Sequence, residues 1–176
     1  IHSFFQLPLS PFVPESTVKP RFEYSKQKRQ IMRTLDLLII DEISMVRADI
    51  LDAIDSILRR FREHNKPFGG VQLLMIGDLQ QLTPIVRPDE EKLLSRYYNT
   101  PYFFDSKALQ STQYVTIELT KVFRQQDKVF IDILNHFRDG HVSDEDFDIL
   151  NKRYQPNFTP DKNSDYIHLT THNRIA

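Results

Sequence analysis

Residues 38–44 read Leu-Ile-Ile-Asp-Glu-Ile-Ser, and this stretch decides the fold. A mostly apolar run from Leu35 to Ile40 ends directly in two carboxylates, Asp41 and Glu42. Short apolar runs of this kind are typical of strands buried in a parallel sheet, and parallel strands end at a crevice where ligands bind. The first acid can hold the hydration shell of Mg²⁺, and the second can take a proton from water. The stretch therefore predicts the Walker B half of a phosphate-hydrolysing site, although an acidic helix N-cap is an equally simple interpretation of the two acids alone.

The other half of such a site is a glycine-rich loop that ends in Lys-Ser or Lys-Thr, and these 176 residues do not contain one. We therefore expect the chain to be part of a nucleotide-driven machine, from a point after its phosphate loop. By itself it should bind ATP weakly or not at all. The start at Ile1 has neither an initiator Met nor the features of a signal peptide, which fits a longer protein.

Composition sets broad limits on the class of protein. The length suits one domain, or one domain and a piece of another, and 40% hydrophobic residues can fill a core. The absence of Cys excludes disulfides and thiolate metal sites, and no apolar run is long enough for a transmembrane helix. The net charge of −1 gives no sign of nucleic acid. One basic cluster is either a solvated surface or a phosphate contact; its residues are Arg21, Lys26, Lys28, Arg29 and Arg33.

The first half of the chain shows a strand–helix–strand pattern. Apolar residues from Ala48 to His64 recur at helical spacing, and acidic and basic residues occupy the other face. This predicted helix lies between two predicted buried strands, Leu35–Asp41 and Val71–Ile76. Such a pattern predicts a parallel α/β sheet. Before it, four prolines within residues 7–20 predict an extended loop, and residues 26–34 predict a short helix.

The second half is harder to interpret. Residues 79–112 look irregular, with a helix start near Asp89. Helices are expected from Lys128 to Arg138 and from a cap near Ser143 to Arg153, followed by a linker at 155–165. Further strands are expected at Pro101–Phe104, Tyr114–Leu119 and Tyr166–Thr171, with a turn at His172-Asn173.

A second polar strand exit supports the nucleotide hypothesis. The sequence Gly-Asp-Leu-Gln-Gln-Leu-Thr-Pro occupies residues 77–84, directly after the second predicted strand, and should share a sheet edge with Asp41. Gly77 should let the backbone turn sharply. Gln81 can orient a water or touch a γ-phosphate, as glutamines do in other nucleotide hydrolases. The alternative is a polar loop closed by Pro84.

Two other motifs carry weaker signals. Leu119-Thr120-Lys121-Val122-Phe123-Arg124-Gln125 also follows a predicted strand, and Arg124 can act on a γ-phosphate; a salt-bridged surface Arg is the simpler alternative. His2-Ser3-Phe4-Phe5 combines aromatic, hydroxyl and imidazole groups suited to stacking on a single nucleic-acid strand. Core packing of Phe4 or Phe5 is equally compatible.

Taken in order, these motifs resemble the Pif-type branch of the RecD-like superfamily 1 DNA helicases over roughly residues 1–140. The string Asp-Glu-Ile-Ser-Met-Val at 41–46, with its Ala-Asp-Ile-Leu-Asp continuation, is the most specific part. The resemblance implies a RecA-like P-loop NTPase fold with a mostly parallel sheet flanked by helices, truncated before the phosphate loop. It also implies a first motor domain over 1–155 and a linker with the first strand of a second domain over 156–176.

The resemblance further implies an ATP-dependent helicase that moves 5′ to 3′ on single-stranded DNA and opens forked duplexes, with roles in repair, recombination and telomere maintenance. Asp41 would hold Mg²⁺ through water, Glu42 would activate the attacking water, and Gln81 and Arg124 would contact the γ-phosphate of ATP. The expected DNA path comprises His2, Ser3, Phe4, Thr83 and Pro84. An intracellular location follows, in the bacterial cytoplasm or in a eukaryotic nucleus or mitochondrion.

Two other hypotheses compete with this one. The chain could be a non-catalytic nucleic-acid-binding or adaptor module with a remnant of the fold, but Asp41, Glu42, Gln81 and Arg124 are all retained. It could be an unrelated P-loop ATPase, but the His-Ser-Phe and Phe-Arg-Gln motifs disfavour that class. The helicase hypothesis is therefore preferred.

Overall fold

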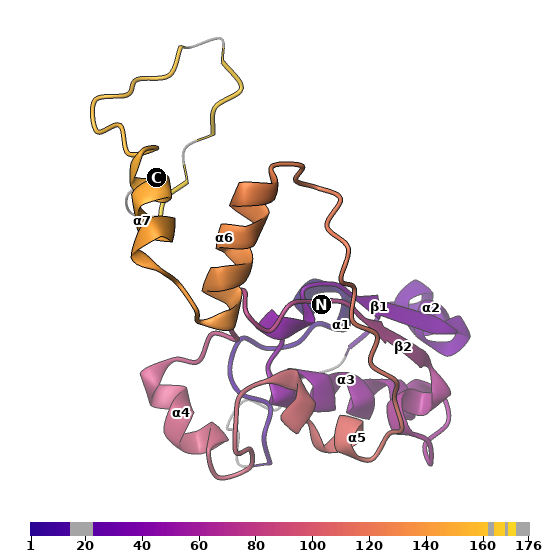
Figure 1. The fold of residues 1–176 in the computed structure, drawn as a ribbon. Coiled ribbons are helices and arrows are strands. Elements are labelled where there is room, and N and C mark those ends of the chain that lie inside the picture. The colour runs from indigo at the N-terminus through magenta and orange to yellow at the C-terminus, as the bar shows by residue number, and fades with distance from the viewer. Residues whose placement is uncertain (15–22, 162–163, 168, 172–176) are drawn as a thin grey trace. The chain divides into compact units, whose positions relative to one another are not determined.

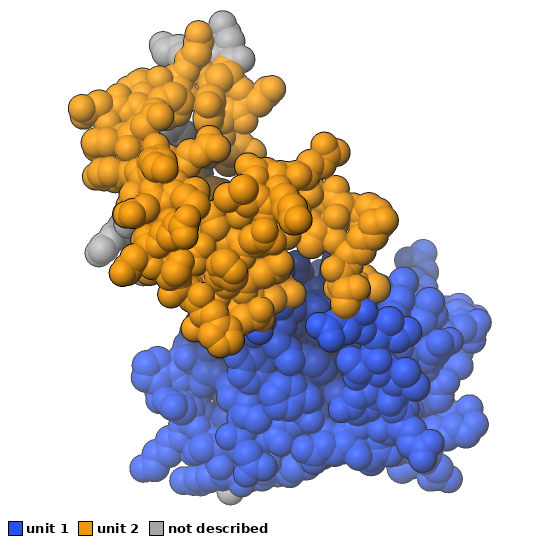
Figure 2. Space-filling model, viewed as in Figure 1, with its two compact units in different colours: residues 1–118 blue, residues 119–176 orange. Residues whose placement is uncertain are grey.

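Figure 1 shows the computed structural model, which describes residues 1–14, 23–161, 164–167 and 169–171. The chain forms two compact units, Ile1–Glu118 and Leu119–Ala176, coloured separately in Figure 2. We describe each unit by itself. The division at residue 118 follows contacts between Cα atoms, so the expected boundary between motor domains at residues 155 and 156 stays a prediction.

The first unit is built on a two-stranded parallel sheet. Strand β1 (Leu37–Ile40) pairs with β2 (Gln72–Met75) in the register Leu37 with Gln72 and Ile40 with Met75. Helix α3 (Ala48–Phe61) connects them, as Figure 1 shows. The predicted strand–crossover helix–strand unit is therefore confirmed, and so is the α/β class.

Both strands are shorter and more exposed than the sequence predicts. In β1 only Ile40 is buried, whereas Ile39 is 55% exposed. The reason is strand geometry: successive side chains point to opposite faces of the sheet. Ile40 packs in the core cluster that contains α3, while no element among the described residues covers Ile39 on the opposite face. The prediction of strands buried on both faces is wrong for this part of the chain.

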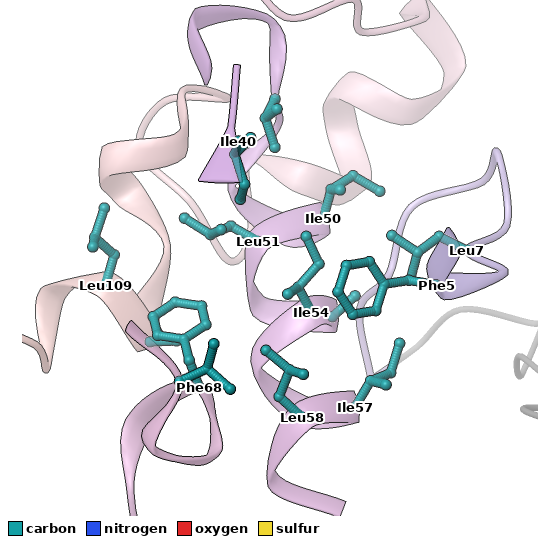
Figure 3. Close-up of a cluster of buried hydrophobic side chains, with 14 of the residues drawn as sticks. Phe5, Leu7, Ile40, Ile50, Leu51, Ile54, Ile57, Leu58, Phe68 and Leu109 are labelled. Carbon is teal, nitrogen blue, oxygen red and sulfur yellow. The ribbon is translucent and has the colours of Figure 1, made fainter. Parts of the chain in front are cut away.

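Helix α3 forms the centre of the core (Figure 3). Its apolar face buries Ile50, Leu51, Ile54, Ile57 and Leu58, as the helical spacing predicts. The helix ends at Phe61 rather than His64, because Arg62, whose N–H still donates to Leu58 O, has φ of −129° and ψ of −132°, outside the helical region. The 3₁₀ turn η2 (Pro67–Gly70) then places Phe68 against the helix.

The core can be tested at Ile54, which is fully buried. Ile54→Ala should lower the free energy of unfolding by about 3 kcal/mol, because a buried branched side chain is lost and a cavity remains. Urea unfolding measures this loss. The matched control is Ile31→Ala, since Ile31 is half exposed, and it should cost less than about 0.5 kcal/mol. Equal losses at both positions would contradict the assignment of α3 to the core.

The polar face of α3 is not a solvent-facing surface. Asp52 accepts hydrogen bonds from Tyr98 Oη (2.7 Å), Ser106 Oγ (2.6 Å) and the Ala108 N–H (2.9 Å). Burial first, and then the hydrogen bond to Asp52, raise the pKa of Tyr98 well above its ordinary value. Asp52 therefore holds the chain around Tyr98 and Ser106 against the helix. Sequence periodicity alone does not reveal that role.

The segment after β2 contains short helices and no further strand. Helix α4 (Pro88–Leu94) begins near Asp89 as predicted, and α5 (Lys107–Gln110) was not anticipated. The predicted strand Pro101–Phe104 is wrong, because η3 (Phe103–Asp105) occupies it and only Tyr102 makes an isolated bridge, to Arg47. The predicted strand Tyr114–Leu119 is also wrong: it has the right alternation but pairs with no strand among the described residues.

The remaining helices agree with the predictions, except for the short helix at His2–Phe5, which was not anticipated. In the first unit, α1 (His2–Phe5) precedes α2 (Lys26–Thr34), which is capped by Ser25. In the second unit, α6 (Lys128–Asp139) ends at Gly140 with φ of 72°, and α7 (Asp144–Asn151) starts at the predicted Ser143 cap. No strand is assigned in the described part of 166–171, and His172-Asn173 lies outside the described residues. Among the described helices, none is long and apolar enough to cross a membrane.

Candidate nucleotide site and single-strand surface

The turn after β1 presents both predicted acids to solvent. Asp41 and Glu42 are exposed, and Asp41 Oδ1 accepts a hydrogen bond from the Glu42 N–H at 2.9 Å. Glu42 has φ of 52° and ψ of 45°, in the left-handed region that residues other than glycine seldom occupy. Such strain, on the order of 1–3 kcal/mol, persists where surrounding structure enforces it, and it clusters at functional sites. The 3₁₀ turn η1 (Ile43–Met45) follows and is buried at Ile43 and Ser44.

The turn after β2 presses against this first turn. The Ile43 N–H donates to Ile76 O at 2.9 Å, so the two strand exits are joined directly. A Cβ atom on Gly77 would lie 2.9 Å from Ile43 Cγ2 and 3.0 Å from Ile43 N. The predicted shared sheet edge is thus confirmed. The predicted reason for Gly77 is wrong, since its φ is not positive; it is required because the backbone of the neighbouring turn leaves no room for a side chain.

Gln81 is oriented by Asp78, a residue that sequence reasoning passed over. Gln81 Nε2 donates to Asp78 Oδ2 at 3.1 Å, and the Gln80 N–H donates to Asp78 Oδ1 at 3.0 Å. An Asp that bonds the backbone two residues on is a familiar turn device, and this was the available sequence signal. Gln81 itself is exposed. The structure therefore gathers Asp41, Glu42 and the Gln81 loop at one end of the sheet.

Arg124 belongs to the second unit. It is exposed and lies in the segment that precedes α6. Its contact with a γ-phosphate stays a prediction. A metal ion or nucleotide would have to be held in the first unit by the exposed Asp41 carboxylate and its neighbours, and a single carboxylate with water ligands suits Mg²⁺.

The residues predicted for the single strand divide between surface and core. His2 and Ser3 are exposed, Phe4 is half buried, and Phe5 is fully buried, with the two rings edge to face at 4.8 Å. Lys28 Nζ donates to Ser3 O at 2.9 Å and lies 5.8 Å from the Phe4 ring centroid. A basic residue of α2 thus joins the aromatic motif. Arg21 lies outside the described residues.

His2 faces a groove of about 350 Å³ that is also lined by Met45, Ile85 and Arg87. Partial burial is the largest cause that lowers the pKa of His2. An imidazole at this position suits stacking on a base or hydrogen bonding to it. Sequence reasoning quoted Met45 within the string at 41–46 but assigned neither Met45 nor Ile85 to a site, because an exposed apolar side chain has no chemistry that marks it as a ligand contact.

Thr83 and Pro84 differ in exposure. Thr83 is exposed, whereas Pro84 is buried beside a separate cavity of about 290 Å³ that Val86, Leu94 and Tyr98 also line. Of this pair, Thr83 is the residue open to a ligand. Its neighbours Ile85 and Arg87 reach the groove that contains His2, so the loop after Gln81 and helix α1 contribute to one surface.

A parallel strand pair joined by a crossover helix, with acidic residues where the first strand ends, is typical of α/β proteins that bind ligands at the carboxyl ends of their strands. Comparison with known proteins refines this class. Residues 1–148 match the family model of the PIF1-like helicases, and the chain belongs to that family.

Two curated relatives illustrate the similarity. The chain is 44% identical over 111 residues to ATP-dependent DNA helicase RRM3 of Saccharomyces cerevisiae, covering 63% of the chain and 14% of the relative. It is 45% identical over 109 residues to human ATP-dependent DNA helicase PIF1, and the match covers 61% of the chain and 16% of the relative. The chain thus spans about one sixth or less of these curated relatives.

Solved structures agree with this membership. The structure of Pif1 helicase from Bacteroides with ADP-AlF3 and single-stranded DNA matches with a TM-score of 0.92 and 39% identity, over 99% of this chain and 40% of that one. A structure of two coordinating Pif1 helicases at forked double-stranded DNA matches with a TM-score of 0.80 and 42% identity, over 86% of this chain and 36% of that one. The RecA-like fold inferred from the sequence is therefore confirmed.

Proposed function

We propose that this chain forms part of the motor of an ATP-dependent DNA helicase that moves 5′ to 3′ along single-stranded DNA and opens forked duplexes. The observation that carries the proposal is the joined pair of strand exits, which holds Asp41 and Glu42 beside Gly77 through the bond from Ile43 N–H to Ile76 O. The named activities of the family relatives support it.

Each acid has a distinct role in the proposed reaction. Glu42 accepts a proton from the water that attacks the γ-phosphate, as a general base. Asp41 would hold Mg²⁺ through water, and the ion would neutralise charge on the phosphates. The hydrogen bond from the Glu42 N–H fixes the Asp41 carboxylate relative to Glu42.

Gln81 and Arg124 are proposed to contact the γ-phosphate. Gln81 is held by Asp78 in the loop that continues to Thr83 and Ile85, so the same loop reaches the groove that His2 faces. A change at the phosphate can therefore be transmitted along a few residues of backbone to the strand surface. Arg124 would add positive charge to the transferring phosphoryl group.

Single-stranded DNA is proposed to bind on the surface formed by His2, Ser3, Phe4 and Thr83. Its contacts would be stacking and phosphate pairing with little sequence readout. Lys28, beside Phe4, supplies one positive charge for a phosphate. The forked duplex would lie beyond this strand, and the compartment follows the DNA: bacterial cytoplasm, or eukaryotic nucleus or mitochondrion.

Phe4→Ala in the full-length protein should weaken single-stranded DNA binding about tenfold, since stacking of one base on an aromatic ring contributes about 1–3 kcal/mol. Fluorescence anisotropy with a labelled oligonucleotide measures the dissociation constant. The matched control is Phe147→Ala, because Phe147 is a half-exposed aromatic in the second unit. Unchanged affinity in Phe4→Ala, or equal weakening in both variants, would contradict the assignment of Phe4 to the DNA-binding surface.

The whole function is tested by ATP hydrolysis and duplex unwinding. The full-length protein should hydrolyse ATP, should be stimulated by single-stranded DNA, and should open a fork that carries a 5′ tail. DNA binding without hydrolysis would instead support an adaptor with a remnant of the fold. Hydrolysis that DNA does not affect would favour an unrelated ATPase.

A further inference from the structure

Three charged side chains are buried together in the first unit. Arg47 and Glu90 are each 8% exposed, and Asp49 is 0% exposed. Arg47 Nε and Nη2 donate to the two oxygens of Asp49 at 2.9 and 2.8 Å, and Arg47 Nη1 donates to Glu90 Oε2 at 3.0 Å. Buried ion pairs of this kind seldom add net stability, because desolvation offsets the attraction. Their geometry therefore suggests a role in fixing the relative position of the elements they join.

The joined elements come from three places in the chain. Arg47 directly follows the turn that carries Asp41 and Glu42, and it is the residue before α3. Asp49 also accepts a hydrogen bond from the Phe12 N–H at 2.8 Å. Glu90 lies in the first turn of α4 and accepts from the Arg87 N–H at 3.4 Å, at the end of the loop that begins after Gln81.

The same cluster forms one wall of the groove that His2 faces. Arg47 and Glu90 line that groove together with Met45, which precedes them, and Ile85 and Arg87 from the loop. A displacement of α4 away from α3 would therefore widen the groove. It would also move the loop that carries Gln81 at its other end.

We propose that Arg47 is a positioning residue that holds the loop 82–87 in a fixed relation to the turn 41–46. The turn that carries the acids and the surface proposed for single-stranded DNA then shift together. DNA binding and ATP hydrolysis are thereby coupled. The coupling rests on the function proposed above, whereas the positioning does not. Arg suits the task because its planar fork satisfies both carboxylates at once, and a Lys ammonium lacks that fork.

The test compares Arg47→Lys with Arg59→Lys in the full-length protein. Arg59 is the control, because it lies within α3 and its guanidinium bonds to Asp55, away from the groove. Amide hydrogen exchange within residues 82–90, followed at the hydrogen-bonded amides of Arg87 and Glu90, should accelerate about tenfold in Arg47→Lys, with residues 50–58 unchanged, as expected for loss of one charged hydrogen bond. Arg59→Lys should leave residues 82–90 unchanged.

The second measurement is ATP hydrolysis as a function of single-stranded DNA concentration. In Arg47→Lys the DNA concentration for half-maximal stimulation should rise about tenfold, because one charged hydrogen bond is lost. The rate at saturating DNA should fall less than about threefold. A merely structural role would lower the maximal rate with the folded fraction and leave the half-maximal concentration unmoved. If Arg47→Lys fails to fold, Glu90→Ala provides a second variant, because it removes the Arg47–Glu90 ion pair and leaves the Arg47–Asp49 pair. It should show the same rise in the half-maximal DNA concentration.

Exchange that is unchanged at 82–90, or raised equally throughout the first unit, would overturn the positioning role. Raised exchange with an unmoved half-maximal DNA concentration would overturn the coupling. If the wild-type protein shows no stimulation by DNA, the proposed function fails and the coupling fails with it, while the exchange result still decides whether Arg47 fixes the loop.

Discussion

Glu42→Gln in the full-length protein lowers the maximal rate of ATP hydrolysis about a thousandfold, within the range expected for loss of a general base. Gln has nearly the same shape as Glu but cannot accept the proton from the attacking water. ATP binding should be retained, because Asp41, assigned to Mg²⁺, and Gln81, assigned to the γ-phosphate, are untouched. A phosphate-release assay at saturating DNA measures turnover, and a fluorescent nucleotide measures binding.

The matched control is Glu63→Gln, an exposed acid that follows α3 and pairs only with Lys66 at 2.7 Å among the ion pairs of the described residues. Its turnover should equal that of the wild-type protein. Turnover within about tenfold of wild type in Glu42→Gln would contradict the assignment of the base, since a base contributes about a hundredfold or more. Lost turnover together with lost ATP binding would instead indicate a collapsed site.

Gly77→Ala should both destabilise the protein and inactivate it. The new Cβ would lie 2.9–3.2 Å from Ile43 Cγ2, Ile43 N and Ser44 N, so the two strand exits must move apart. Overpacking of this kind costs about 1–3 kcal/mol. A displacement of about 1 Å at a catalytic site can lower turnover about a hundredfold. Thermal unfolding and phosphate release measure the two effects on the same sample.

Gly140→Ala provides the control for Gly77→Ala. A Cβ at Gly140 meets nothing within 4 Å, although its φ of 72° makes Ala strained there. Its stability loss should be about 1 kcal/mol, with turnover unchanged. Wild-type turnover in Gly77→Ala would show that the close approach of the two turns does not set the geometry of the site.

The sequence predicts those elements whose pattern is local. Helix α3 follows from its apolar spacing, and the start of α7 follows from its capping residue, Ser143, which is a local signal too. The parallel pairing of β1 and β2 follows from the crossover helix between them. The nearness of the Asp41 turn to the Gly77 turn then results from that topology, without any knowledge of side-chain contacts.

Features set by distant contacts could not be predicted in this way. Tyr114–Leu119 alternates like a strand, but a strand needs a hydrogen-bonding partner, and the sequence does not identify one. Asp52 looks like a solvated residue, yet it binds Tyr98 and Ser106, which lie 46 and 54 positions away. The pairing of Arg47 with Glu90 spans 43 positions. Such long-range polar contacts leave no periodic signal.

The most direct measurement is the rate of ATP hydrolysis by the full-length protein with and without single-stranded DNA, for wild type and Glu42→Gln side by side. The proposed function predicts hydrolysis that DNA stimulates in the wild type and that is lost in Glu42→Gln, with DNA binding retained in both. Absent hydrolysis in the wild type, or equal hydrolysis in the two proteins, would contradict the assignment of this chain to a DNA-driven ATPase motor.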